Sequence, residues 1–333
     1  MIELVCPAGS PAALKAALEK GADAVYVGAN NRSNARAFPG LNFSPDHLSE
    51  TVRQVHGKQR KVFLALNTYP RPEDLAEWQA TLDAAGQAGV DAFIIAELSM
   101  LRHAERHWPQ IPRHLSVQGS ATNLASLQFF HEHYGISRAV LPRVLSLQQV
   151  ERLASKSPVA LEVFAFGSLC IMVEGRCQLS SHVTGKSPNC DGVCSPAESV
   201  TWEEIPGGKR RVRLGDVLID EFQPEEAASY PTVCKGRYQA DKGFYYALEE
   251  PTSLNTLSIL PLLADAGVAA VKIEGRQRGP AYVGQVTQVW REAIDRLAHQ
   301  RSSFIVAPSW QQTLAHVAEG KQTTLGPYQR DWH

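Results

Sequence analysis

The stretch PAALKAALEKGADAVYVG, residues 11–28, runs from an apolar helical pattern through one glycine into a buried strand. Pro11 begins the helix and Gly21 stands just past its end, which are the positions that these two residues favour. Glycine suits a helix end because it adopts the left-handed backbone conformation at little cost. The order of helix, glycine and apolar strand recurs at Gly89, Gly135 and Gly267. The chain is therefore predicted to alternate helices with strands.

Eight strands follow from this pattern. Their expected starts are near residues 2, 22, 61, 91, 114, 137, 160 and 269, with helical patterns between them. Alternating strands and helices imply a parallel sheet, and eight such units imply an α/β fold of the (β/α)8 TIM-like barrel type. An open, doubly wound sheet is the alternative. The helices around the last strand are expected over residues 254–266 and 280–298.

One gap interrupts the alternation, between the seventh strand, which ends at Gly167, and the eighth. We expect residues 168–252 to form an inserted, cysteine-containing subdomain at the C-terminal mouth of the barrel, where barrels of this kind carry their active sites. Its basic run, residues 209–213, is interpreted as a solvated turn. The predicted organisation is strands one to seven (1–167), the insertion (168–252), the last helix, strand and helix of the barrel (253–300), and a C-terminal tail (301–333) that packs outside it.

Composition excludes several classes of protein. The 333 residues include 33 Lys and Arg against 34 Asp and Glu, and the 44% of hydrophobic residues is ordinary for a globular chain. A net charge of -1 argues against a general binder of nucleic acid or anionic membranes, since both need a cationic surplus. The start MIELVCPAGS lacks a secretory pattern, and no apolar run predicts a transmembrane segment, so a cytoplasmic protein is expected.

Five of the six cysteines fall within residues 170–234. Disulfides are disfavoured in a reducing cytosol, so this clustering favours a metal or cluster site. Four thiolates can hold zinc or a 4Fe-4S cluster, and the absence of tight CxxC pairs favours iron and sulfur over zinc. A set of buried inert thiols is the alternative. The four candidate ligands are Cys170, Cys177, Cys194 and Cys234, whereas Cys190 is interpreted as a bystander and Cys6 as a small core residue.

The stretch VKIEGRQR, residues 271–278, carries the second signal. Side chains alternate along a strand, so Lys272 and Glu274 share the face that points into the barrel. Burying these charges is costly unless they pair with each other, as a structural ion pair, or meet a ligand. Arg276 follows in the loop, where it could bind a carboxylate with two hydrogen bonds.

Other polar residues gather where strands end, at the same rim of the barrel. Arginines and a lysine that converge there suggest an anionic small molecule, possibly a di-acid. These rim residues are Arg36 and Asn42 after the second strand, Asn67 after the third, Glu97 after the fourth, Gln118 after the fifth and Arg143 after the sixth.

The residues from Glu162 to Ser180 carry a family resemblance. Their pattern, E-x-F-x-x-G-S-L-C-x-x-x-x-G-x-C-x-L-S, is similar to the signature of the collagenase-like peptidase family, the thirty-second among peptidases of unknown catalytic type. The blocks NARAFPGLNF, SVQGSATN, LPRVLSL and KIEGRQRGPAYV also resemble that family. FGSLCIMVEGRC, CKGRY and EEPTSLNTL are most similar to its UbiU-like branch, which acts in ubiquinone biosynthesis.

This resemblance implies an enzyme of oxygen-independent hydroxylation, acting on quinone precursors or RNA bases with prephenate as the oxygen source. It implies a 4Fe-4S cluster on the four candidate cysteines. It also implies a heterodimer with a UbiV-like paralogue, and a lipid-carrier accessory protein could present the quinone precursor.

The resulting hypothesis assigns a role to each rim residue. Arg36, Arg143, Lys272 and Arg276 hold the carboxylates of the di-acid, and Asn42, Asn67 and Gln118 complete the substrate site. Glu274, Lys272 and Glu162 are the candidate catalytic residues, with either glutamate relaying protons. The alternatives are an RNA-base hydroxylase, a zinc-stabilised protease and a non-catalytic scaffold.

Overall fold

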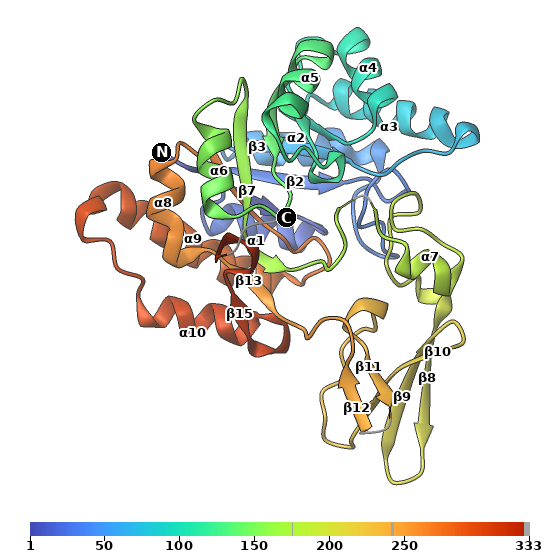
Figure 1. Ribbon diagram of the computed structural model, residues 1–333. Coiled ribbons are helices and arrows are strands. Elements are labelled where there is room, and N and C mark those ends of the chain that lie inside the picture. The colour runs from blue at the N-terminus through green and yellow to red at the C-terminus, as the bar shows by residue number, and fades with distance from the viewer. Residues whose placement is uncertain (175, 241–242, 330–333) are drawn as a thin grey trace.

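A computed structural model describes residues 1–174, 176–240 and 243–329, and its centre is a closed parallel barrel (Figure 1). The eighth barrel strand pairs with both the first and the seventh, which closes the sheet. The (β/α)8 prediction is therefore confirmed, and the open doubly wound alternative is wrong. The strands are β1 (Glu3–Pro7), β2 (Ala24–Gly28), β3 (Lys61–Leu66), β4 (Ala92–Ile95), β5 (Arg113–Leu115), β6 (Ile136–Val140), β7 (Ala160–Ser168) and β14 (Ala270–Ile273).

Helices surround this barrel, and their ends explain why they form where they do. Gly89 and Gly135 end α3 and α5 in the left-handed conformation, as the sequence predicted. Ser146 and Gln149 form a reciprocal capping box at the start of α6. The helices are α1 (Pro11–Glu19), α2 (Leu48–His56), α3 (Leu75–Ala88), α4 (Leu98–His107), α5 (Leu124–Tyr134), α6 (Leu147–Ala154), α8 (Leu260–Asp265) and α9 (Pro280–His299). None of the helices in the described ranges combines the length and apolar character that a membrane crossing requires.

The alternation of side chains along the strands divides the core into two layers. Val271 and Ile273 point outward and belong to the large core between strands and helices. Tyr26 and Phe63 point inward with small apolar neighbours and form a separate cluster inside the barrel. The Tyr26 hydroxyl donates a hydrogen bond to the carbonyl oxygen of Ile273 at 2.8 Å, which joins β2 to β14 across the interior. Lys272 therefore points into the barrel, as predicted.

One predicted helix begins too early. Residues 253–255 form a strand, β13 (Ser253–Asn255), which pairs antiparallel with the end of β7, and the helix α8 starts only at Leu260. The nine-residue β7 extends past the four-residue β14, so part of its edge lies beyond the barrel pairing. Pairing with β13 satisfies backbone groups that would otherwise be left open along this edge.

The insertion between β7 and β14 carries its own small sheets, which extend from the barrel as an arm in Figure 1. Their packing rests on a compact apolar cluster that includes Val212, Ile219 and Phe222. The elements are α7 (Leu179–Thr184), the three-stranded sheet of β8 (Val200–Ile205), β9 (Lys209–Leu214) and β10 (Val217–Phe222), and the hairpin of β11 (Arg237–Ala240) and β12 (Gly243–Tyr246).

The basic run of the insertion lies in the central strand β9, so its interpretation as a turn is wrong. Lys209 and Arg211 both pair with Glu221, at 3.3 and 2.9 Å. Arg213 pairs with Glu203 at 3.4 Å. Carboxylates of the flanking strands therefore offset three of the four cations, and Arg210 donates to the Glu226 carbonyl oxygen at 2.9 Å. Most of the positive charge of the run is thus opposed, whereas a nucleic-acid backbone attracts unopposed charge.

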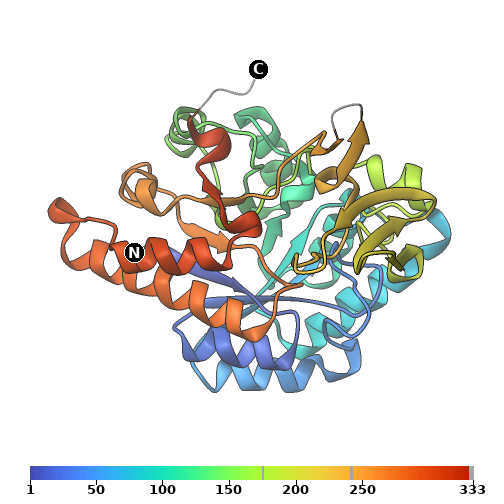
Figure 2. The same cartoon turned by 90° about the horizontal axis from the view of Figure 1, so that it is seen from below.

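The C-terminal tail packs outside the barrel over only part of its length. Its helix α10 (Pro308–Val317) lies beside α9 (Figure 2), and the Trp310 indole donates to Glu292 at 2.8 Å. The strand β15 (Thr323–Thr324) then pairs with β13, and the Tyr328 hydroxyl reaches the Phe164 carbonyl oxygen at 3.4 Å. The end of the tail therefore contributes to the mouth of the barrel, which the sequence did not predict.

Candidate functional site

A small cavity of about 60 Å³ lies at the C-terminal mouth of the barrel. Seven predicted site residues line it: Arg36, Asn67, Gln118, Arg143, Lys272, Glu274 and Arg276. Tyr26, Phe164 and Glu174 also line it and were not predicted. The rule that strand ends meet at one rim therefore located the cavity, although it could not say which charges pair there.

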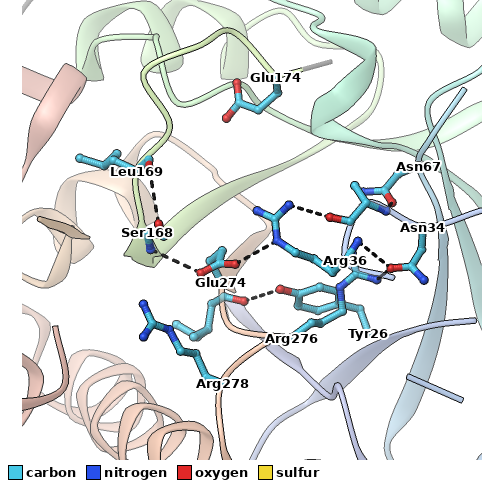
Figure 3. A network of polar contacts seen from close by, with 12 residues as sticks. Tyr26, Asn34, Arg36, Asn67, Ser168, Leu169, Glu174, Glu274, Arg276 and Arg278 are labelled. Atoms are coloured by element: carbon cyan, nitrogen blue, oxygen red, sulfur yellow. Dashed lines mark hydrogen bonds and ion pairs between the residues drawn. The ribbon is translucent and has the colours of Figure 1, made fainter. Parts of the chain in front are cut away.

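Arg276 follows β14 and is nearly inaccessible to solvent, with 4% of the residue exposed. Its guanidinium donates to Asn34 Oδ1 at 3.0 Å and lies over the Tyr26 ring, 5.4 Å from the centroid (Figure 3). Burial lowers the pKa of Arg276 to about 10, and Glu274 opposes this only through longer-range attraction. Across residues 1–174, 176–240 and 243–329, no carboxylate forms an ion pair with Arg276. A buried cation without a paired anion marks a place where a ligand anion can bind.

Arg36 and Glu274 form an ion pair in the cavity wall, in which Arg36 Nε lies 3.6 Å from Glu274 Oε1 (Figure 3). Burial disfavours the charged form of Glu274, but the attraction of Arg36, together with that of Arg278 and Arg143, outweighs it and lowers the pKa of this carboxyl. Burial likewise opposes the charge of Arg36, and Glu274 together with smaller contributions from other groups reverses that effect, so that the Arg36 pKa is raised. Glu274 is therefore ionised and pairs with Arg36, although it shares a strand face with Lys272.

Arg143 and Glu174 form another ion pair, which is more enclosed. Arg143 Nε lies 2.8 Å from Glu174 Oε1, and the two side chains are 8% and 5% exposed. The guanidinium also donates to the Ser168 carbonyl and stacks over Phe164, 4.5 Å from its centroid. The second oxygen of Glu174, Oε2, is buried without a hydrogen-bond partner in the described structure.

Lys272 pairs with Glu162 rather than with Glu274, at 2.8 Å, and Glu162 is fully buried. Arg138 contacts the other oxygen of Glu162 at 3.0 Å and also pairs with Glu3 at 2.7 Å. Burial opposes ionisation of Glu162, but Lys272 and Arg138 lower its pKa to about 2. Glu162 thus acts as the centre of an ion triad inside the barrel, and a carboxyl this acidic holds no proton near neutral pH.

The three predicted amides differ in what they contact. Asn67 accepts a hydrogen bond from the Ala35 amide at 2.9 Å, and Asn42 donates to the Arg36 carbonyl at 2.7 Å. Both therefore brace the loop that carries Arg36. Gln118 Oε1 is buried with no partner among the described atoms, so this acceptor is available to a ligand. Glu97, the remaining rim prediction, instead caps α4 by accepting from the Met100 amide at 2.9 Å.

The four candidate cysteines lie near this cavity and influence one another electrostatically. Burial raises the pKa of Cys194, and Cys170 and Cys177 add to the increase. Burial also raises the pKa of Cys234 to about 11, with contributions from Cys170 and Cys194. Arg36 counteracts the increase at Cys194. Thiols beside cations are the donor chemistry that an iron–sulfur cluster uses.

The remaining cysteines stand apart from this set. The charges that act on Cys190 come from Arg71, Asp191 and Asp74. Cys6 is completely buried, and burial raises its pKa to about 12. Within the described residues, no three His, Cys, Asp or Glu side chains are already arranged to hold a metal ion. The four thiols therefore fit a cluster in kind, and their segments would have to draw closer to bind one.

The end of the tail joins two of the cysteine segments. Glu319 pairs with Lys235, which follows Cys234, and with Arg278 at 2.5 Å. It also accepts from the Ser168 hydroxyl at 3.1 Å. The Lys235 ammonium donates to that same hydroxyl at 2.9 Å. The Lys235 side chain is therefore held between Glu319 and Ser168.

Replacing Glu319 by glutamine is expected to lower the free energy of unfolding by about 1–3 kcal/mol, since hydrogen bonds to charged groups are worth roughly this much. The change leaves Lys235 and Arg278 without their shared carboxylate. Urea denaturation of the full chain measures this loss in the free energy of unfolding. Glu250→Gln is the control, because Glu250 is exposed and bonds only Gln322 in the same region. Equal stability of both variants would contradict the role of Glu319.

Gly28, at the end of β2, makes room for Arg276. A Cβ atom at this position would lie 2.5 Å from Arg276 Nη1 and 2.6 Å from Asn34 Cγ. Gly28→Ala is therefore expected to displace the guanidinium and to weaken anion binding about 10- to 100-fold, the value of one charged hydrogen bond. Calorimetric titration with prephenate measures this loss. Gly284→Ala on α9 meets only ordinary contacts and serves as the control; an unaffected Gly28→Ala variant would contradict the expectation.

Besides Phe164, sequence reasoning missed Tyr26 and Glu174 in the cavity wall and Asn34, which contacts Arg276. Tyr26 alternates with Gly28 along β2 and therefore faces inward, a signal that was available. Asn34 lies in the NARAFPGLNF block, but its contact with Arg276 joins residues 242 positions apart. Glu174 stands between two candidate cysteines, and only the fold shows that it meets Arg143.

Comparison with known proteins places the chain among relatives with different names. It is 32% identical over 303 residues to a protein named as an uncharacterised protease in Methanocaldococcus jannaschii, covering 89% of this chain and 65% of the relative. It is 29% identical over 325 residues to tRNA hydroxylation protein P1 of Bacillus subtilis, covering 97% of this chain and 70% of the relative. The chain thus spans about two thirds of the length of these curated relatives.

A solved structure of a U32 peptidase is also similar, with a TM-score of 0.43 and 14% identity, covering 50% of this chain and 70% of the other. The family model named peptidase family U32 matches residues 9–329. The chain therefore belongs to peptidase family U32, the collagenase-like family that the sequence blocks resemble.

Proposed function

We propose that this chain is the catalytic or electron-supplying subunit of an oxygen-independent hydroxylase. Its acceptor is the ring of a quinone precursor, and its oxygen donor is a small carboxylic acid such as prephenate, bound at the barrel mouth. The observation that carries this proposal is the buried guanidinium of Arg276, which has no paired carboxylate among the described residues. Such a cation favours an anionic ligand over a neutral one.

The chain's own side chains suggest how the donor is held. Arg276 and Arg143 provide two guanidinium groups on the cavity wall. Gln118, which also lines the cavity, provides a hydrogen-bond acceptor. Arg36 and Glu274 form the adjoining pair, in which Glu274 can accept a proton once Arg36 moves to a ligand. Lys272 stays with Glu162 beneath the cavity and contributes positive charge.

Electron balance limits the reaction that this site can assist. Replacing a ring hydrogen by a hydroxyl group removes two electrons from the acceptor. The donor must therefore lose its hydroxyl, gain hydrogen and take up two electrons, so that D–OH and Ar–H become D–H and Ar–OH. A 4Fe-4S cluster on Cys170, Cys177, Cys194 and Cys234 would supply or relay single electrons beside the cavity.

The acceptor and its delivery are part of the same proposal. A quinone precursor is large and apolar, so a UbiV-like partner in a heterodimer, or a lipid-carrier protein, would shelter it at the mouth. The enzyme would act in the cytoplasm. The cavity is too small to hold such a precursor, so a surface outside the cavity would have to shelter it.

An RNA base is the second candidate acceptor, because the Bacillus subtilis relative is named as a tRNA hydroxylation protein. The paired basic run of β9 and the net charge of -1 argue against it, since binding to nucleic acid draws on unopposed cations. A zinc-stabilised protease is the third candidate, and the metal content of the purified protein tests it.

One experiment separates these functions. The full chain is purified with its paralogue under argon and analysed for iron, sulfide and zinc, and a deletion strain is grown with and without oxygen for quinone and tRNA-modification profiles. We expect iron and sulfide in the protein and a quinone defect confined to growth without oxygen. A defect in tRNA modification alone would transfer the function to RNA, and stoichiometric zinc without iron would overturn the cluster.

A further inference from the structure

We propose that Glu174 is a specificity-determining residue, an internal carboxylate that occupies the Arg143 subsite until a carboxylate of the ligand replaces it. This inference rests on the carboxylic-acid ligand of the proposed function. It adds that a second carboxylate of the ligand binds at Arg143 and that Glu174 must leave Arg143 first.

The pair has the geometry of a bound ligand rather than of a surface ion pair. Both side chains are at least nine-tenths buried, and the Arg143 guanidinium is clamped between Glu174, the Ser168 carbonyl and the Phe164 ring. Only Oε1 of Glu174 is satisfied, because Oε2 has no hydrogen-bond partner in the described parts of the chain. A buried carboxylate with one unsatisfied oxygen is held less favourably than a ligand that satisfies both.

The cavity is small for the proposed ligand. Its volume of about 60 Å³ has room for a few water molecules. A ring-bearing di-acid is several times larger. Glu174 forms part of the cavity wall, so its withdrawal from Arg143 both enlarges the space and frees a cation.

The exchange also defines which ligands can enter. A neutral ligand would have to leave Arg143 buried without a counter-charge, which costs several kcal/mol in general. A ligand carboxylate restores the ion pair that Glu174 gives up. The site therefore selects acids partly by penalising neutral competitors.

The test compares prephenate binding to the full chain, purified without oxygen, with binding to Glu174→Gln, measured by calorimetric titration. Glutamine keeps the volume but removes the competing charge, so we expect affinity to rise about tenfold. Glu97→Gln is the matched control, because Glu97 caps α4 and does not line the cavity. Equal or weaker binding by Glu174→Gln would overturn the inference while leaving the proposed ligand intact. Failure of both proteins to bind would overturn the ligand and the inference together.

Discussion

Replacing Arg276 by methionine is expected to weaken prephenate binding at least about 100-fold, because a bidentate, charged contact is lost. The same change is expected to leave the fold as stable as before, or more stable by about 1–3 kcal/mol. Replacing buried charges by apolar groups of similar volume is often neutral or stabilising, and Arg276 has no paired carboxylate among the described side chains. Calorimetric titration and urea denaturation measure the two effects.

The opposite signs of these effects make the test informative. Arg276→Lys is the comparison variant, because it keeps the charge but loses the two-pronged geometry. It should bind prephenate with intermediate affinity. A methionine variant that is strongly destabilised would show that Arg276 is a structural residue, and one that binds normally would remove the basis of the proposed function.

Replacing Glu162 by glutamine is expected to destabilise the protein by about 3–5 kcal/mol, since it leaves the buried charges of Lys272 and Arg138 without their shared carboxylate. Urea denaturation at neutral pH measures this loss. The control is Glu198→Gln, which breaks an exposed pair with Lys186 and should cost less than about 1 kcal/mol. Similar losses in both variants would contradict the role of the triad.

The Glu162 triad also predicts a pH dependence. The ordinary pKa of this carboxyl is 4.5, and the folded protein lowers it to about 2. The stabilisation from its ionised form is therefore present above pH 4.5 and is lost as the pH falls towards 2. The loss amounts to about 3 kcal/mol. Denaturation curves from pH 5 to pH 2 should show it in the wild type and not in Glu162→Gln.

The barrel itself could be predicted from the sequence because its signals are local. Gly89 and Gly135 close their helices in the predicted conformation, and the apolar strands follow directly. The strand β13 could not be predicted in this way. Its three residues pair with the end of β7 only because that strand outlasts its barrel neighbour, which is a property of the assembled sheet.

The site shows the same division between local and non-local information. Alternation along β14 correctly placed Lys272 inside the barrel, but its partner is Glu162, 110 residues earlier. Asn42 was expected to contact substrate, and its side-chain amide also holds the carbonyl of Arg36, a contact that the sequence did not predict. Position at a strand end thus predicts the neighbourhood of a side chain, whereas the choice of partner depends on which loops fold over the rim.

The position of β14 after the insertion affects how the molecule is made. β14 inserts between β7 and β1, so the ring of strands cannot close until residue 273 has left the ribosome. The insertion, with its thiols, emerges before β14, and at about 5–20 residues per second it precedes closure by several seconds. During that interval the nascent sulfurs meet the surrounding solution without the finished rim above them. β15 and Tyr328 follow β14 and complete the wall after the thiols have been exposed.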